Sequence, residues 1–204
     1  MSRRAIFLDR DGVLVRDVGP LTSSADIVLT PGVAVALAQL ARADFRLIVV
    51  SNQTVVARGL LDEGAVIELE REIEARIQAE GGPALDAFYF CPHHPKATRR
   101  ELRADCACRK PAPGLLLRAA AEHDISLEGS FMIGDRASDI EAGLRAGCTT
   151  IQLTTGAHLA PAIEVTGGFE ARPAHHVAAS LPRAAAFVLG HSRDRRPASR
   201  GAAS

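Results

Sequence analysis

Reactive side chains follow several of the short apolar runs in this sequence. Asp9 and Asp11 follow the run AIFL, Ser51 follows FRLIVV, and Asp135 follows FMIG. Two carboxylates two positions apart in an extended chain point to the same side, so one can attack a substrate while the other transfers protons. Because crowded carboxylates repel one another, a divalent cation is the usual remedy, and Asp135 would complete an oxygen-rich Mg²⁺ site.

A phosphoryl group is the substrate that such a site suits. The cation, Ser51 and Lys110 could neutralise and hold this group while Asp9 becomes an aspartyl phosphate. Gly12 would let the backbone turn close to it. Each acid taken singly can instead be a loop carboxylate or a helix cap, but the combination favours catalysis. Asp139 either orients Lys110 or the metal shell, or is a solvated acid at the start of a helix.

A second group of reactive side chains lies in residues 91–111, CPHHPKATRRELRADCACRKP. The pattern C-x-H, followed after residues 94–105 by C-x-C, suits a closed, four-coordinate structural Zn²⁺ site. Its ligands would be Cys91, His93, Cys106 and Cys108. The alternative is a set of reduced buried thiols beside a surface histidine. We expect His94 to be a loop residue or the partner of a ligand, and Cys148 to be a core thiol.

The elements that would position these residues alternate along the chain. Short apolar runs indicate strands at AIFLD, FRLIVVSN, LDAFYF, FMIGD and TTIQL. Helical patterns are predicted over residues 33–40, 66–77, 115–123 and 140–146. Asp62 is a plausible N-cap of the second helix, Pro31 suits the first turn of the first, and Gly147 would end the last. This alternation predicts a doubly wound, Rossmann-like α/β domain whose parallel strands end at one crevice.

Composition and charge exclude several classes of protein. The 204 residues are 47% hydrophobic, with 24 basic and 24 acidic side chains, which is ordinary for one well-buried domain. The balanced charge gives no reason to expect nucleic acid or a membrane as a partner, and no apolar run suits a signal peptide or a transmembrane helix. We therefore expect a cytoplasmic protein, and also a monomer, in which clustered cysteines bind metal. We predict one domain over residues 1–190 and a disordered basic tail over 191–204.

Four motifs resemble the signature motifs of the haloacid dehalogenase phosphatase superfamily: DRDGVL, SNQ, RKP and GDRASD. The stretches SNQTVVARG, YFCPHHP and CACRKPAPG are similar to one branch, the D-glycero-D-manno-heptose 1,7-bisphosphate 7-phosphatases and the related histidinol-phosphatases. The resemblance implies a Mg²⁺-dependent phosphoric monoester hydrolase that removes the 7-phosphate of the heptose bisphosphate. The alternative is a phosphatase of the same fold acting on another small phosphomonoester, such as histidinol phosphate or another sugar phosphate.

The resemblance also implies a role for each residue of the site. Asp9 is the nucleophile, and Asp11 is the general acid and base, which also lends its backbone carbonyl to Mg²⁺. Asp9 and Asp135 are the carboxylate ligands, while Ser51 and Lys110 stabilise the transferring phosphoryl group. The same branch has a zinc loop that matches the four proposed zinc ligands position by position. Further substrate contacts are expected at Asp17, Val18, Gly19, Pro20, Asn52, Gln53, Thr54, Arg109 and Arg136.

The spacing of the motifs predicts an open, capless site. The stretches from Asp9 to Ser51 and from Ser51 to Lys110 leave no room for a cap domain, which suits a small sugar phosphate. Some positions where the sugar would lie depart from residues common in the relatives, namely Val13, Pro20, Val55 and Arg136. A non-enzymatic, zinc-stabilised binding module is the rival from a different class, and it predicts no phosphate release.

Overall fold

The structure, a computed structural model, describes residues 2–154 and 172–194 of the chain. These residues form one six-stranded sheet in the order β3-β2-β1-β4-β5-β6, and every neighbouring pair is parallel. The strands are β1 (Arg4–Leu8), β2 (Phe45–Asn52), β3 (Ala87–Cys91), β4 (Phe131–Gly134), β5 (Thr149–Leu153) and β6 (His176–Ala178). The strand order reverses between β1 and β4, which is where folds of this kind bind ligands. The predicted doubly wound parallel sheet is confirmed.

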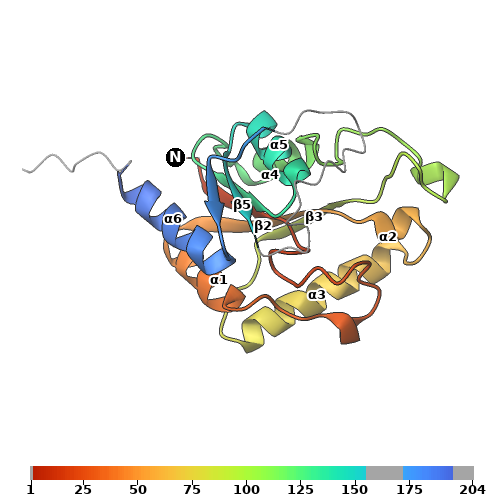
Figure 1. Ribbon diagram of the computed structural model, residues 1–204, viewed down its shortest axis with the longest axis horizontal. Coiled ribbons are helices and arrows are strands. Elements are labelled where there is room, and N and C mark those ends of the chain that lie inside the picture. Colours follow the sequence, from red (N-terminus) through yellow and green to blue (C-terminus); the bar gives the residue numbers. More distant parts are fainter. Residues whose placement is uncertain (1, 155–171, 195–204) are drawn as a thin grey trace, which may run out of the picture.

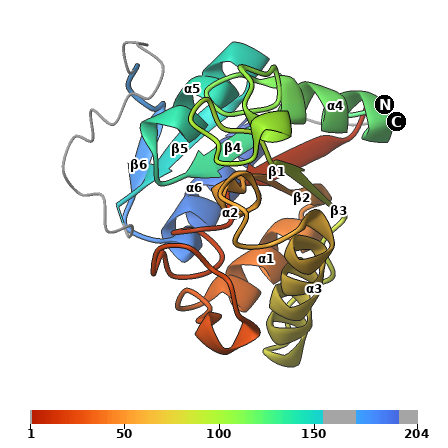
Figure 2. The same ribbon diagram turned by 90° about the vertical axis from the view of Figure 1, so that its right-hand side faces the viewer.

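Helices cover both faces of the sheet, and Figures 1 and 2 show them as separate layers. One layer holds α1 (Val33–Arg42), α3 (Glu63–Ala79) and α6 (Leu181–Asp194), and the other holds α4 (Gly114–His123) and α5 (Ala137–Ala146). Each layer has its own apolar core against the sheet. The central strands β1 and β4 are therefore buried on both sides, which explains their uninterrupted apolar sequences.

Helix α3 shows how the sequence pattern produces a helix and its buried face. The carboxylate of Asp62 accepts a hydrogen bond from the N–H of Ala65 at 2.7 Å, so the predicted N-cap is confirmed. The apolar side chains at helical spacing are buried as predicted, namely Val66, Leu69, Ile73 and Ile77. One buried residue on this helix carries a carboxyl group, namely Glu70, which is only 6% exposed. Glu70 becomes important for the site described below.

Several boundaries differ from the sequence-based prediction. Helix α1 begins at Val33 after the left-handed residue Gly32, so Pro31 precedes the helix and does not lie in its first turn. The sequence-based prediction missed the adjacent elements β6 and α6, because their sequences carry no distinctive apolar pattern. Helix α6 continues to Asp194, past the expected domain boundary at 190, and residues 195–204 of the expected tail lie outside the described residues. Gly147 ends α5 with φ 86°, as predicted.

The connections that leave the carboxyl ends of the strands are short. Between β1 and β2 the chain adds only the turn η1 (Ser24–Asp26) and α1, and between β2 and β3 only α2 (Thr54–Ala57) and α3. Between β3 and β4 lie a long loop with η2 (Arg100–Leu102) and then α4. Residues 2–154 therefore carry no inserted cap domain. In the described part of the chain, none of the helices combines the length and apolar character needed to cross a bilayer.

Candidate active site

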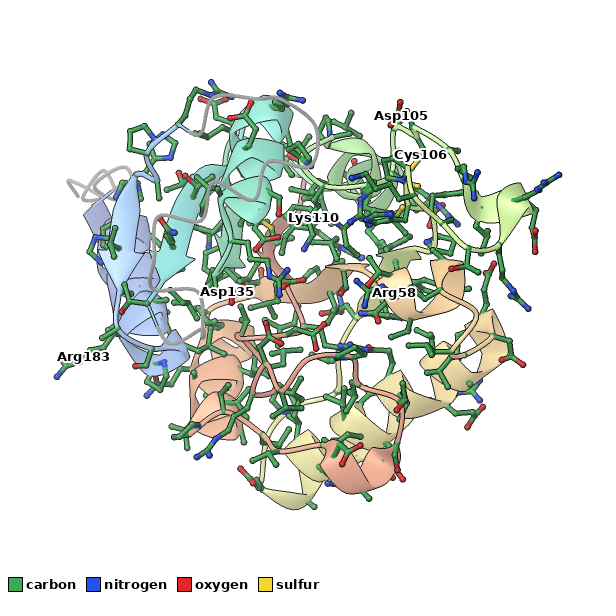
Figure 3. All side chains as sticks on the ribbon, turned by 45° about the vertical axis from the view of Figure 1, so that its right-hand side comes forward. Arg58, Asp105, Cys106, Lys110, Asp135 and Arg183 are labelled. Carbon is green, nitrogen blue, oxygen red and sulfur yellow. The ribbon has the colours of Figure 1, made fainter. Side chains whose placement is uncertain are left out.

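The buried carboxylates lie at the reversal of strand order between β1 and β4. Asp9 directly follows β1, Asp135 directly follows β4, and each is only 5% exposed. The N–H of Asp9 donates to the carbonyl of Ile133 at 3.0 Å, which fixes the two strand ends side by side. Ser51 lies near the end of β2 and is 1% exposed. Figure 3 shows Asp135 and Lys110 near the middle of the molecule, at these strand ends.

Lys110 ties the strand ends together from the opposite side. Its Nζ lies 2.7 Å from Asp9 Oδ1, 2.7 Å from Asp139 Oδ1 and 2.8 Å from the carbonyl oxygen of Val50. Burial alone would lower the pKa of Lys110, but Asp139 and Asp9 raise it above the usual value. The three N–H groups of this ammonium are thus all engaged, and it stays charged beside the proposed nucleophile.

The acids around Lys110 carry more charge than one ammonium can balance. One oxygen from each of Asp9, Asp135 and Asp139 lies within 4.8 Å of the others. Both carboxylate oxygens of Asp135 are buried and accept no hydrogen bond from the described residues. Burial, followed by the charges of Asp139 and Asp9, raises the pKa of Asp135 to about 8. A hard divalent cation bound by oxygen ligands would relieve this repulsion, so these residues fit Mg²⁺.

Asp139 and Asp135 play different parts in this cluster. The Oδ2 of Asp139 accepts the N–H of Arg136 at 3.0 Å, and its Oδ1 accepts Lys110. Asp139 therefore orients Lys110, whereas Asp135 has its oxygens available for a cation. Asp139 is 1% exposed, so the alternative of a solvated acid at the helix start is wrong. A side chain at Gly134 would overlap the carboxylate of Asp139, which explains why glycine ends β4.

Gly12 brings the loop after β1 against the acidic cluster. It has φ 80°, a conformation that glycine adopts without strain, and a Cβ atom there would overlap the carboxylate of Asp135. The predicted turn is confirmed. Glycine at this position also leaves the space that the Asp135 carboxylate occupies.

Asp11 does not join the three clustered carboxylates. Its Oδ1 and Oδ2 accept hydrogen bonds from Nε and NH2 of Arg10 at 3.0 and 2.8 Å. The chain bends at residue 10, directly after Asp9, so the extended backbone from which the same-side expectation was drawn does not continue through Asp11. Burial raises the pKa of Asp11 above its usual range, against the lowering effect of Arg10. A metal contact of Asp11 would therefore fall to its backbone carbonyl.

Two residues expected to contact the substrate, Asn52 and Gln53, also hold Lys110 and Ser51. The Nε2 of Gln53 donates to Ser51 Oγ at 2.8 Å, which fixes the direction of the hydroxyl. The side-chain amide of Asn52 accepts the N–H of Lys110 at 3.1 Å and donates to its carbonyl at 3.0 Å. Thr54 begins the short helix α2 beside them. Sequence reasoning placed these residues at the site, but their contacts come from the tertiary fold.

The loop after β1 spans the site and meets the loop after β4. Asp17 accepts a hydrogen bond from NH2 of Arg136 at 2.7 Å and another from the N–H of Gly19 at 3.0 Å. Val18 is 59% exposed on this loop, next to Gly19 and Pro20. A cavity of about 400 Å³ lies beside it, between Asp17 and the start of α6 at Leu181. The expected loop residues thus line the rim of the crevice.

The Cys/His cluster lies where β3 ends and the long loop returns. The sulfurs of Cys91, Cys106 and Cys108 lie 3.2 to 3.5 Å apart, and His93 Nδ1 lies 3.4 Å from Cys108 Sγ and 3.7 Å from Cys91 Sγ. Thiolates on a tetrahedral zinc with Zn–S bonds of about 2.3 Å would stand roughly 3.8 Å apart. The three thiols are reduced, and they converge with the imidazole of His93. The four side chains therefore fit a zinc ion bound through Nδ1 of His93. His93 is partly buried, and its Nδ1 lies beside the sulfurs, which favours the metal site over a surface histidine.

The neighbours of this cluster behave as the sequence predicted. The Nδ1 of His94 accepts the N–H of Lys96 at 3.0 Å within the loop. Cys148 is 3% exposed in the core under α5, and burial raises its pKa to about 12, as expected for an inert thiol.

Cations gather on the side of the crevice next to this loop. The NH1 of Arg109 donates to the carbonyl of His93 at 3.0 Å, so the loop orients this guanidinium. The pKa of His94 is lowered by burial and then by the charges of Arg109, Arg58 and Lys96, which lie close enough to act on one imidazole. Figure 3 shows Arg58 on the same side of the molecule as Lys110. The crevice therefore has an acidic side at β1 and β4 and a basic side at the loop.

Sequence reasoning missed two members of the site. Arg10 is 2% exposed, and its NH1 donates to Glu70 Oε1 on α3 at 3.2 Å. Glu70 lies four positions after Val66 and three before Ile73, so it falls on the buried face of the predicted helix. A charged residue on an apolar helical face was the signal that could have revealed it.

Comparisons with known proteins agree on one family. A family model described as HAD-hydrolase-like matches residues 107–184. The D-glycero-beta-D-manno-heptose-1,7-bisphosphate 7-phosphatase of Photorhabdus laumondii is 39% identical over 153 residues, covering 74% of this chain and 81% of that protein. The enzyme of the same name from Escherichia coli K12 is 37% identical over 161 residues, covering 78% of this chain and 84% of that protein.

A solved structure is similar over nearly the whole chain. It is the D,D-heptose 1,7-bisphosphate phosphatase from B. bronchiseptica complexed with magnesium and phosphate, with a TM-score of 0.77 and 30% sequence identity. The match covers 92% of this chain and 99% of that one.

Proposed function

We propose a function from one premise: the chain belongs to the D-glycero-D-manno-heptose-1,7-bisphosphate 7-phosphatase family of the haloacid dehalogenase superfamily. The protein is a Mg²⁺-dependent phosphoric monoester hydrolase that removes the 7-phosphate of D-glycero-D-manno-heptose 1,7-bisphosphate. The observation that carries this function is the buried set of Asp9, Lys110, Asp139 and Asp135 at the reversal of strand order. Its chemistry suits covalent phosphoryl transfer.

In the first step Asp9 attacks the phosphorus of the 7-phosphate. Lys110 engages Oδ1 of Asp9, which leaves Oδ2 to form the new bond as the bond from phosphorus to the sugar oxygen breaks. Asp11 gives its proton to the departing sugar oxygen. The hydroxyl of Ser51, held by Gln53, contacts the transferring phosphoryl group, and the ammonium of Lys110 balances its charge from its place between Asp9 and Asp139.

In the second step water attacks the phosphorus of the aspartyl phosphate. Asp11 accepts a proton from this water, the bond to Asp9 breaks, and inorganic phosphate leaves with the enzyme restored. Asp9 and Asp135, with the backbone carbonyl of Asp11, would hold Mg²⁺, which neutralises charge on the phosphoryl oxygens when bound. The neighbouring enzyme complexed with magnesium and phosphate supports this cofactor.

The basic side of the crevice supports a substrate with a second phosphate. Arg109, Arg58 and Lys96 lie around His94, and Arg109 directly precedes Lys110 in the chain. The planar fork of Arg109 suits a phosphate better than a lysine would. The rim residues Asp17 to Pro20 and Arg136 would contact the sugar on the opposite side.

The proposed zinc ion would order the loop that presents these cations. Residues 92–109 bury few apolar side chains, so metal binding would supply much of the free energy that folds them. The convergence of Cys91, His93, Cys106 and Cys108 supports zinc at this place. The zinc would have no part in bond breaking, because its four positions are filled by protein ligands.

The experiment that tests this function measures phosphate release from a panel of compounds with Mg²⁺ present or chelated. The panel contains the heptose 1,7-bisphosphate, sugar monophosphates and histidinol phosphate. We expect the bisphosphate to give the highest kcat/KM, with loss of activity on chelation and in Asp9→Asn. Turnover by Asp9→Asn at the wild-type rate would reject the covalent mechanism, and preference for histidinol phosphate would reject the substrate alone.

A further inference from the structure

A buried polar chain connects helix α3 to the loop after β1. Glu70 on α3 accepts NH1 of Arg10 through Oε1 at 3.2 Å, and Arg10 holds both oxygens of Asp11. The side chains of Arg10 and Glu70 are 2% and 7% exposed, whereas that of Asp11 is 21% exposed. The three residues therefore run from the core to the place where the proposed general acid works.

Arg10 is fixed more firmly than its position in a loop suggests. Its carbonyl accepts the N–H groups of Leu14 and Val15 at 2.9 and 3.1 Å, which anchors its backbone. Its guanidinium uses the Nε and NH2 edge for Asp11 and the remaining NH1 for Glu70. A planar guanidinium held along two edges has one orientation, so the plane of the Asp11 carboxylate follows from it.

Glu70 is a costly residue to place inside the core for stability alone. Its Oε2 is buried and accepts no hydrogen bond from the described residues. Breaking or unevenly satisfying a buried ion pair is destabilising, and apolar side chains of similar volume often serve the fold as well or better. The neighbouring buried positions on α3 are indeed apolar, as in Leu69 and Ile73. An apolar residue at position 70 could not accept the hydrogen bond from Arg10.

We propose that Glu70 is a positioning residue for the general acid: by holding NH1 of Arg10, it sets the orientation in which Asp11 presents its carboxyl group to the leaving oxygen. This inference rests on the proposed function, in which Asp11 protonates the sugar oxygen. Both oxygens of the Asp11 carboxylate accept hydrogen bonds from Arg10, so the guanidinium sets the orientation of this carboxyl group. Loss of Glu70 frees the guanidinium to turn, and Asp11 turns with it.

The test compares two leaving groups, because only a poor one needs the acid. The measured quantity is kcat/KM for the heptose bisphosphate and for 4-nitrophenyl phosphate, whose phenolate leaves without a proton. The value of kcat/KM reports only the steps up to departure of the leaving group. The later role of Asp11 as a base therefore does not affect it. For Glu70→Met we expect about a 10-fold or greater loss for the sugar phosphate, part of the roughly 10²- to 10⁴-fold contribution of general acids. The aryl phosphate should change less than about 3-fold.

Conservative and control variants separate positioning from folding. Glu70→Gln keeps an oxygen that can accept NH1 of Arg10, so we expect it to restore the ratio of the two constants. Leu69→Ala on the same helix should lower the melting temperature and leave the ratio unchanged. If Glu70→Met does not fold, Arg10→Lys provides the second measurement, because a lysine cannot hold both oxygens of Asp11 and should shift the ratio in the same direction.

The outcomes also distinguish this inference from the function on which it rests. Asp11→Asn should show the same selective loss with a larger size, and equal losses for both substrates there would reject Asp11 as the acid. Selective loss in Asp11→Asn, combined with equal losses in Glu70→Met, would overturn the positioning role alone. Selective loss in Glu70→Met that Glu70→Gln reverses would establish it.

Discussion

In the described part of the chain, two clusters of side chains fit a metal ion, and the fold holds them in different ways. Asp9 and Asp135 directly follow the central strands β1 and β4, and Asp139 lies in the first turn of α5 beside them. The Cys/His cluster begins at Cys91, at the end of β3, and is completed by a loop with little apolar content. The sheet positions the acids before any metal binds, whereas the conformation of the loop depends on its own side chains.

The chemistry of the ligands follows from this difference. The acidic cluster offers hard oxygens and keeps open positions, since both oxygens of Asp135 are without a hydrogen-bonding partner among the described residues. The thiols and the imidazole of the other cluster are softer ligands that fill a tetrahedron. We propose that a metal at the first cluster serves reaction and a metal at the second serves structure. Three changes test this distinction and a fourth tests the buried carboxylate of Glu70, beginning with the largest expected effect.

Removing a ligand from the acidic cluster should abolish activity and increase stability. Asp135→Asn removes a buried carboxylate whose pKa is raised to about 8 by burial, Asp139 and Asp9. We expect kcat/KM to fall by about 10³-fold or more, and the metal-free protein to melt a few degrees higher, roughly 2 to 4 °C per kcal/mol. Phosphate release and thermal unfolding without metal measure the two effects. A lower melting temperature would mean that the acids stabilise the fold, contrary to this distinction.

Shifting the acidic cluster without removing a ligand should have the next largest effect. In Gly12→Ala the new methyl group overlaps Asp135, whose displacement should cost on the order of 10²-fold in kcat/KM. Gly81→Ala is the matched control, because Gly81 has a similar φ of 83° but nothing within 4 Å of an added Cβ. Both variants carry the same backbone strain, so a similar loss of activity in Gly81→Ala would show that strain, and not the contact with Asp135, is responsible.

Removing a ligand from the Cys/His cluster should give the opposite pattern. We expect Cys106→Ser to lose its zinc and to melt at a lower temperature, because the loop loses the metal that orders it. Since Arg109 depends on the carbonyl of His93, KM for the bisphosphate should rise about 10-fold, close to 1.4 kcal/mol, with kcat less affected. Metal analysis and steady-state kinetics measure these changes. Cys148→Ser, which changes the buried thiol outside the cluster, should keep zinc and kinetics as in the wild type.

The smallest expected effect concerns the buried carboxylate of Glu70, of which only one oxygen accepts a hydrogen bond from Arg10. Burial raises the pKa of Glu70 from 4.5 to about 7. Between these values the folded state binds more protons than the unfolded state, so stability falls as pH rises through this window. In Glu70→Gln this dependence should disappear, changing the difference in unfolding free energy between pH 5 and pH 8 by on the order of 1 to 3 kcal/mol. Urea unfolding at both values measures it, and an unchanged pH dependence would show that Arg10 fully compensates the charge.

The sequence predicts most of the sheet and the positions of the acids, for a local reason. Asp9 and Asp135 directly follow buried strands, and parallel strands bring their ends to one edge whatever the loops do. The Cys/His cluster is equally visible in the sequence, because C-x-H and C-x-C are short patterns of rare residue types. Helix α3 could be predicted because its apolar spacing agrees with its N-cap at Asp62.

Contacts between distant segments could not be predicted in the same way. Asn52 was placed at the site, but its contacts with Lys110 follow from where β2 meets the loop before α4. The pairing of Asp11 with Arg10 depends on a bend after β1 that an alternating strand pattern does not contain. The end of α6 at Asp194 was missed because its final turn reads as a polar, arginine-rich segment.

Two hydrogen bonds between Asn52 and the backbone of Lys110 anchor this lysine independently of the rest of its loop. They fix Lys110 to β2 directly, whatever path residues 94–105 follow before the chain returns at Cys106. Insertions and deletions in that span should therefore be tolerated by the phosphoryl-transfer chemistry, provided that the metal ligands still converge. Evolution, or protein engineering, could redesign this segment for new sugars while the reaction that it serves stays the same.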